Sequence, residues 1–192
     1  MEKNKKRQSF PDNAELVFKG EIFEVWQWEQ ELFDGSKTTF EKIWRVPTVE
    51  IIATVGDKIL IEKQDQPDRK NNICLVSGRA DQSEDMLVEA KRELLEETGC
   101  ASDDWELFLK HGGDGKVIHE VYYFIARNCR KIQEQKLDAG EKIETVLVNF
   151  EEFVKLTEEK NFWVSPEFIN YILRLQFNPQ LKEEFRKKLF KT

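Results

Sequence analysis

Cysteine is scarce in this 192-residue chain. The three that occur, Cys74, Cys100 and Cys129, are an odd number and show no CxxC spacing. A disulfide framework needs paired cysteines and a zinc site needs closely spaced ligands, so the sequence indicates neither. Reduced thiols are typical of the cytoplasm, where we expect the protein to reside.

Long apolar runs are also lacking. No stretch of about 18 uninterrupted apolar residues occurs, so no membrane-spanning segment is expected. The basic start of the chain, MEKNKKRQSF, is followed by polar residues rather than by an apolar stretch, so it does not resemble a signal peptide. We expect residues 1–14 to form a flexible, solvated tail.

Positive charge is in the minority. Lys and Arg total 30 against 37 for Asp and Glu, which gives a net charge of −7. Nucleic acids are bound through clustered cations, so a nucleic acid is not expected as the partner. A phosphorylated small molecule remains compatible if metal ions screen the carboxylates. With 40% hydrophobic residues, the chain can bury one core.

Alternating apolar and polar residues predict the strands. Residues 15–32 alternate, and Asp34-Gly35 offers a turn into residues 37–45, which predicts an N-terminal antiparallel β-hairpin within residues 15–46. A second, more buried hairpin is expected from 49–54 and 58–62. Further strands are expected at 105–109, 117–126 and 143–150.

One helix is predicted between Ser83, as its N-cap, and Gly99, which ends it. Leu87, Ala90 and Leu94 form an apolar stripe that can pack on a sheet. Two or three helices are expected to close the chain, at 151–159, 165–176 and 179–189. Strands that frame one helix, with more helices at the end, indicate a mixed α/β sandwich.

The predicted helix carries acidic residues on the side opposite the apolar stripe. Glu93, Glu96 and Glu97 are spaced to project side by side, and Glu89 lies one turn earlier. Such a face is often simply solvated. Because like charges repel, a bound cation would explain the cluster better. Carboxylates without His or Cys select Mg²⁺ or Mn²⁺.

The sequence around this helix settles the choice in favour of a metal. From Gly78 it reads GRADQSEDMLVEAKRELLEETGC, which resembles the Nudix box Gx5Ex7REUxEExGU, where U is a bulky apolar residue. Seven fixed letters coincide by chance on the order of 10⁻⁸ per start position. Cys100 at the last U position departs from the pattern, as do Val76 and Ser83 where the family often has Pro and Gly. The matched positions are Gly78, Glu84, Arg92, Glu93, Leu94, Glu96, Glu97 and Gly99.

The resemblance implies a Nudix α/β/α sandwich over residues 47–192, with a mixed sheet and C-terminal helices. It also implies a metal site formed by Glu93, Glu96 and Glu97, with Glu93 and Glu97 as the direct ligands. The carbonyl group of Ser77 would complete the site. Arg92 would orient the catalytic glutamates by an ion pair, and Glu84 would fix the box internally.

Beyond the box, the chain resembles the ADP-ribose pyrophosphatase branch of the family. The resemblance covers the N-terminal strand pair, RVPTVEIIA, the segment Gln64-Asp65-Gln66 and LDAGEKIETVLVNFEEF. It implies Mg²⁺-dependent cleavage of a nucleoside diphosphate sugar, ADP-ribose first, to a nucleoside monophosphate and a sugar phosphate. It further implies a homodimer built through the N-terminal strands. Glu141 would act as general base, with Asp138 and Glu144 as alternatives.

Substrate contacts are expected from aromatic and cationic residues. In the same branch an N-terminal aromatic stacks on the base, so Trp26 and Trp28 are candidates, although at least one should serve packing. Arginine forks suit phosphates and riboses, which makes Arg45, Arg69 and Arg79 candidates. His111 and His119 lack carboxylates at ligand spacing and are expected to be structural.

Two other functions fit the same residues. The substrate of such a hydrolase could be another nucleotide sugar, a dinucleotide or a nucleoside triphosphate. A Nudix-like binding domain without catalysis is the other possibility. The intact REUxEE core argues against it, because mutually repelling glutamates have no use without a metal.

Overall fold

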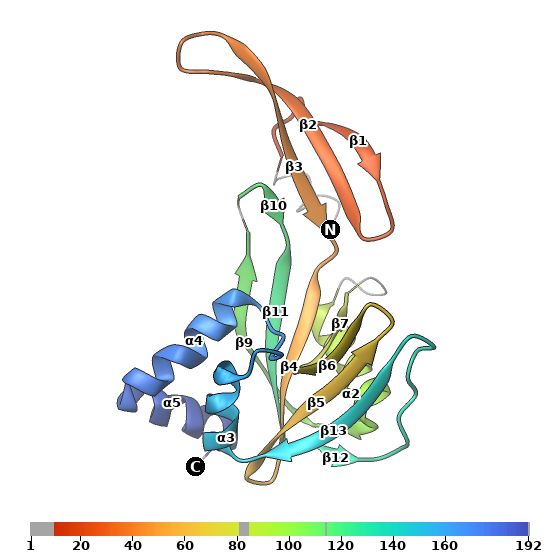
Figure 1. Ribbon diagram of the computed structural model, residues 1–192, viewed down its shortest axis with the longest axis vertical. Helices are drawn as coiled ribbons and strands as arrows, with labels where there is room; N and C mark the ends of the chain where they lie inside the picture. Colours follow the sequence, from red (N-terminus) through yellow and green to blue (C-terminus); the bar gives the residue numbers. More distant parts are fainter. Residues whose placement is uncertain (1–9, 81–84, 114, 192) are drawn as a thin grey trace.

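The computed structural model describes residues 10–80, 85–113 and 115–191, and its centre is a mixed sheet. Strands β13 (Lys142–Val148), β5 (Lys58–Gln66), β4 (Thr48–Val55), β11 (Glu120–Arg127) and β9 (Asp104–Gly112) lie side by side in this order (Figure 1). The β4 and β11 strands are parallel, and their other neighbours are antiparallel. Two further strands, β6 (Arg69–Cys74) and β7 (Val76–Arg79), pair with β5 and β4.

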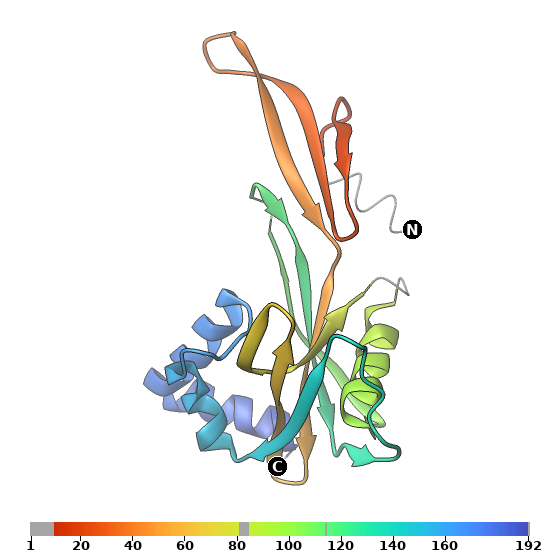
Figure 2. The ribbon, with the colours of Figure 1, turned by 45° about the vertical axis from the view of Figure 1, so that its right-hand side comes forward.

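Helices cover both faces of this sheet. On one face lies α2 (Met86–Thr98), and on the other lie α3 (Phe150–Lys155), α4 (Pro166–Phe177) and α5 (Pro179–Phe190) (Figures 1 and 2). A short 3-10 helix, η1, spans Leu156–Glu158. The short strands β8 (Cys100–Ala101) and β12 (Arg130–Lys131) pair beside α2. The predicted α/β/α sandwich is confirmed.

Strand β4 shows how one sheet serves two cores. Because neighbouring side chains of a strand point to opposite faces, Ile51 packs with Ala90 and Leu94 of α2. The next residue, Ile52, packs on the other face with the cluster that contains Phe168. All of these side chains are fully buried. The two cores fix α2 and the C-terminal helices relative to the same strands.

The N-terminal segment differs from the prediction. Residues 15–32 form two strands, β1 (Glu15–Lys19) and β2 (Phe23–Glu31), because the Gly20 amide donates to the carbonyl of Phe23 at 2.8 Å and closes a turn. With β3 (Lys37–Arg45) and β10 (Val117–Ile118) they form a four-stranded sheet in the order β1-β2-β3-β10. The predicted strand 117–126 is therefore split, since its first two residues join this second sheet.

Part of the expected N-terminal tail is packed. Phe10 stacks on Trp26 with ring centroids 4.8 Å apart, and Ala14 is buried in the same cluster. The hydrophobic contact explains why residues 10–14 follow the sheet instead of extending into solvent. Residues 1–9 of the predicted tail lie outside the described part.

The ends of two elements also differ from expectation. Asp85 caps α2, because its side chain accepts from the amide of Leu87 at 2.9 Å; the predicted cap, Ser83, lies outside the described residues. The predicted stop at Gly99 is confirmed by its φ of 70°. The last predicted strand ends at Val148, since Asn149 begins α3 with a capping box. Within the described ranges, no helix is long and apolar enough to cross a membrane.

Truncating Leu94 tests how firmly α2 is anchored. Leu94→Ala should lower the free energy of unfolding by about 2–5 kcal/mol, because a fully buried side chain leaves a cavity. The matched control on the same helix is Val88→Ala, at a half-exposed position, which should change stability by less than about 0.5 kcal/mol. Urea unfolding measures both. Equal effects would show that α2 is not held by its apolar face.

Candidate active site

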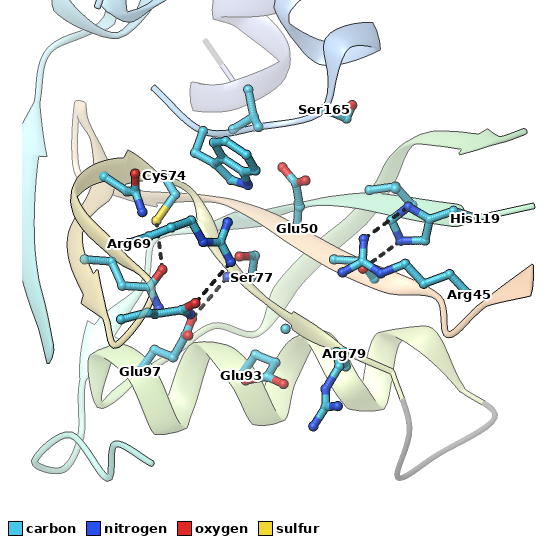
Figure 3. A pocket seen from close by; sticks show the side chains of 18 of the residues that line it. Arg45, Glu50, Arg69, Cys74, Ser77, Arg79, Glu93, Glu97, His119 and Ser165 are labelled. Atoms are coloured by element: carbon cyan, nitrogen blue, oxygen red, sulfur yellow. Dashed lines mark hydrogen bonds between the residues drawn. The ribbon is translucent and has the colours of Figure 1, made fainter. Parts of the chain in front are cut away.

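A cavity of about 1000 Å³ lies between the sheet, α2 and the segment that leads into α4. Its lining comes from strands β3 to β7 and β9 to β11, from α2, from the loop before β13 and from the segment that leads into α4. Figure 3 shows side chains from these elements around one space, with Glu93 and Glu97 on the helix below it and Ser165 above. The topology thus brings together residues that are far apart in the sequence.

Strand β7 lies directly against the acidic side of α2. The amide of Ser77 donates to Glu97 Oε2 at 3.1 Å (Figure 3). A Cβ atom at Gly78 would overlap the side chain of Glu93, so any other residue there would displace the Glu93 carboxylate from this position. Ser77 therefore lies beside Glu97, and Gly78 lies beside Glu93.

Arg92 binds three carboxylates of its own helix. Its guanidinium lies 2.9 Å from Glu89, 2.5 Å from Glu93 and 2.7 Å from Glu96. This arrangement fits the positioning role expected for Arg92. Glu89 is buried in the ion pair with Arg92, so it supports the acidic face from within instead of adding a free carboxylate to it. Glu84, expected to fix the box, lies outside the described residues.

Glu62, at the end of the buried run of β5, adds a carboxylate that the sequence analysis missed. Burial, followed by the charges of Glu141 and Glu93, raises its pKa well above the usual value. Burial and the charge of Glu62 do the same to the pKa of Glu97. Burial raises the pKa of Glu93 to about 7, against the opposing effect of Arg92. The available signal in the sequence was a Glu that directly follows the apolar run Ile59-Leu60-Ile61.

These residues fit a divalent cation by their chemistry. They are buried oxygen ligands of like charge, and Glu62 Oε1 has no hydrogen-bond partner within the described residues. In that same part of the chain, no three acidic, His or Cys side chains are gathered tightly enough to hold a metal ion. Glu93 is instead ion-paired with Arg92, and Glu97 accepts a hydrogen bond from the Ser77 amide.

The three candidates for the general base are separated by the fold. Glu141 and Asp138 both line the cavity, and the Asp138 amide donates to Glu141 Oε2 at 3.3 Å. Glu144 lies on β13 opposite Lys63 and lines a different, smaller groove. The cavity thus brings two of the three candidates near α2.

All three candidate arginines line the cavity. Arg45 lies 3.4 Å from Nδ1 of His119, whose Nε2 lies 2.9 Å from Thr48 Oγ1 (Figure 3). Burial and the charge of Arg45 lower the pKa of His119 to about 4, so this histidine is neutral at pH 7. Arg69 lies over the ring of Trp163 at 4.9 Å, and Arg79 follows the box glycine on β7.

Trp26 and Trp28 lie away from the cavity. Both belong to the cluster around Phe10 in the N-terminal sheet, and Trp28 contacts Phe40 with its ring edge. Within one chain they therefore serve packing, and stacking on a base stays a prediction for a dimer. The aromatic side chain at the cavity is that of Trp163, which is 61% exposed and which the sequence analysis missed. No periodic pattern marks such a loop tryptophan.

Comparison with known proteins identifies the architecture. A family model described as NUDIX domain matches residues 44–171, which is more than half of the chain. The chain belongs to the Nudix family. The matched residues include both β7, with Gly78, and the whole of α2.

Two relatives and one solved structure extend this Nudix assignment. A methanol dehydrogenase activator of Bacillus methanolicus is 24% identical over 89% of this chain and 94% of its own length. An ADP-ribose pyrophosphatase of Bacillus subtilis (strain 168) is 26% identical over 78% of this chain and 83% of its own. A crystal structure of an ADP compounds hydrolase has a TM-score of 0.71 at 19% identity, covering 91% of this chain and 95% of that one.

The expected resemblance to the ADP-ribose pyrophosphatase branch is confirmed by these matches. The chain is a Nudix hydrolase, an enzyme of phosphoanhydride bonds in small nucleotide substrates. Members of this family use a divalent metal, which agrees with the buried carboxylates of this Nudix site.

The raised pKa values of Glu62, Glu93 and Glu97 predict that the metal-free enzyme loses stability as pH rises. The folded state favours their protonated forms, so this contribution is complete below about pH 4.5 and is lost as pH rises; for Glu93 the loss runs through about pH 7. Thermal melts with EDTA should give a lower Tm at pH 8 than at pH 5.5. Glu97→Gln should flatten the dependence. A Tm that rises over this range would contradict the burial of like charges.

Proposed function

We propose that this Nudix hydrolase cleaves the diphosphate of a nucleoside diphosphate sugar, ADP-ribose in the first place. The products would be a nucleoside monophosphate and a sugar phosphate. The observation that carries the proposal is one cavity lined by both the acidic side of α2 and three arginines. Its volume of about 1000 Å³ suits a ligand of this size. The B. subtilis relative bears the name of this activity.

The carboxylates of α2 divide into ligands and supports. Glu93, Glu96 and Glu97, with the Ser77 carbonyl, would hold Mg²⁺, or Mn²⁺ in its place. The cation supplies charge neutralisation of the diphosphate and a lowered pKa of bound water. Arg92 would keep the glutamates oriented by its three ion pairs.

Residues of the opposite walls would bind the substrate and accept the proton. Arg45 and Arg79 line the cavity with guanidinium groups suited to phosphate oxygens. Glu141 would accept a proton from the attacking water, because it lines the cavity and its charge acts on Glu93 and Glu97. Asp138 is the alternative at the same wall. In this role the loop before β13 completes the site.

We further propose a homodimer formed through the N-terminal sheet. Leu16, Phe18 and Phe23 of β1 and β2 are all more than 40% exposed, and such apolar surface is typical of an interface. We also place the enzyme in the cytoplasm, because its three cysteines are free and buried.

A second candidate function is suggested by the B. methanolicus relative, since the match covers 89% of this chain and 94% of the relative. Its name describes a protein that activates a dehydrogenase. For this chain the second candidate is the hydrolysis of a dinucleotide at the same site. It requires no other catalytic residues.

A substrate panel separates these candidates. With Mg²⁺, the wild type should convert ADP-ribose to AMP and ribose 5-phosphate with a kcat/KM at least about tenfold above that for dinucleotides and nucleoside triphosphates, because the cavity is built for one substrate shape. Product analysis by chromatography measures this, with an EDTA-treated sample as the control. Preferred hydrolysis of a dinucleotide would support the second candidate and refute the first.

Exchanging carboxyl groups for amides tests the roles of three glutamates. Glu97→Gln should lower kcat about 10³-fold, since the cation that stabilises transition-state charge would lose an anionic ligand. Glu141→Gln should lower it about 10²-fold, the size of a general-base contribution. Glu144→Gln, outside the cavity, is the matched control and should retain wild-type kcat. Activity of Glu97→Gln at the wild-type level would remove Glu97 from the metal site.

A further inference from the structure

Another buried carboxyl group, separate from those of the acidic site, faces the cavity on the side away from α2. Glu50, on β4, is 8% exposed and lines the cavity, and its Oε2 has no hydrogen-bond partner within the described residues. An unpaired buried carboxyl oxygen is costly, and native structures pair nearly all such groups. In Figure 3 the Glu50 side chain points into the space below Ser165. This position predicts that a hydrogen-bond partner for Oε2 is supplied by the ligand.

The Glu50 carboxyl is held in place from behind. The hydroxyl of Tyr123 forms a hydrogen bond with Glu50, and Tyr123 Oη lies 2.7 Å from Ser165 Oγ. Ser165 in turn caps α4, since its Oγ accepts from the amide of Phe168 at 3.3 Å. This chain of hydrogen bonds ties the carboxyl to the start of a helix. One side of Glu50 is thereby fixed, and its Oε2 remains available.

An exposed indole belongs to the same wall. Trp163 stands two residues before Ser165, and its amide donates to the carbonyl of Ile73 at 2.7 Å, which fixes its backbone. Arg69 lies on the ring, while 61% of the residue is exposed. The amides of Gln64 and Asn72 line the cavity as well. This wall carries an aromatic surface and hydrogen-bonding groups.

The wall suits a group that can donate a hydrogen bond to the unpaired Oε2 of Glu50, which lines the cavity. A sugar hydroxyl provides such a donor. A carboxyl group that binds a ribose hydroxyl is known from dinucleotide-binding folds, and an aromatic ring can cover the apolar face of a sugar.

We propose that Glu50 and Trp163 form the subsite for the sugar attached to the second phosphate, with a sugar hydroxyl bonded to Glu50 Oε2. The proposal rests on the proposed function and names the part of the substrate that this wall recognises. Tyr123 is a positioning residue, because it acts through Glu50. A nucleotide that ends in a phosphate has no hydroxyl to place there and should bind less well.

Variants of Glu50 test the subsite. Glu50→Leu should lower kcat/KM for ADP-ribose about tenfold, mainly through KM, because one hydrogen bond to the substrate is lost. Glu50→Gln should retain most of the activity, since an amide also donates and accepts. Tyr123→Phe should raise KM by a smaller factor. Melting curves check that each variant is folded.

Product inhibition shows which half of the substrate contacts Glu50. The Ki of ribose 5-phosphate should rise about tenfold in Glu50→Leu, while the Ki of AMP stays at the wild-type value. A rise in the Ki of AMP alone would assign Glu50 to the base and overturn the proposal. A loss of kcat with both Ki values unchanged would assign Glu50 to catalysis and would overturn the proposal as well.

The activity of the wild-type enzyme distinguishes a failure of the sugar subsite from a failure of the proposed function. An active wild type whose Glu50→Leu and Tyr123→Phe variants match it in KM and in both Ki values would refute the subsite and leave the proposed function standing. A wild type that hydrolyses no nucleoside diphosphate sugar would refute the proposed function, and the sugar subsite with it.

Discussion

The architecture of this site depends on carboxylates of like charge that are buried together and not allowed to separate. Glu62, Glu93 and Glu97 lose hydration and repel one another, and the fold holds them from several sides. Arg92 pulls on Glu93 from within the helix, and the Ser77 amide fixes Glu97 from the strand. The repulsion and the lost hydration destabilise the fold, and the two apolar cores offset this by anchoring α2 on one face of the sheet and the remaining helices on the other.

The central sheet also decides which groups meet across the cavity. Strand β4 sends alternate residues to the two faces, so Glu50 lies on the side of the C-terminal helices while Ile51 packs under α2. The acidic site and the proposed sugar subsite are thus connected through strands of the same sheet. Their relative position is as rigid as the sheet, which is what a diphosphate bridging the two requires.

Local features of the sequence predicted the elements that depend on neighbours along the chain. The 3.6-residue repeat and Gly99 located the helix, and the spacing of its glutamates predicted one acidic side. The predicted strands were wrong at two breaks: residues 15–32 turn back at Gly20 in a local hairpin, and residues 117–118 pair with the distant strand β3. Hydrophobic alternation reads the same whether a strand continues or turns back, so these breaks could not be predicted.

The sequence by itself determined the family and the helix that carries its motif, and it predicted a divalent cation, because the spacing of carboxylates along one helix is a local property. Only the tertiary structure decided which distant residues complete the site. Glu50, Glu62 and Trp163 come from two strands and a loop, and Glu144 was separated from Glu141 by the path of β13. Contacts between remote segments arise from sheet pairing and core packing, and no short sequence window contains them.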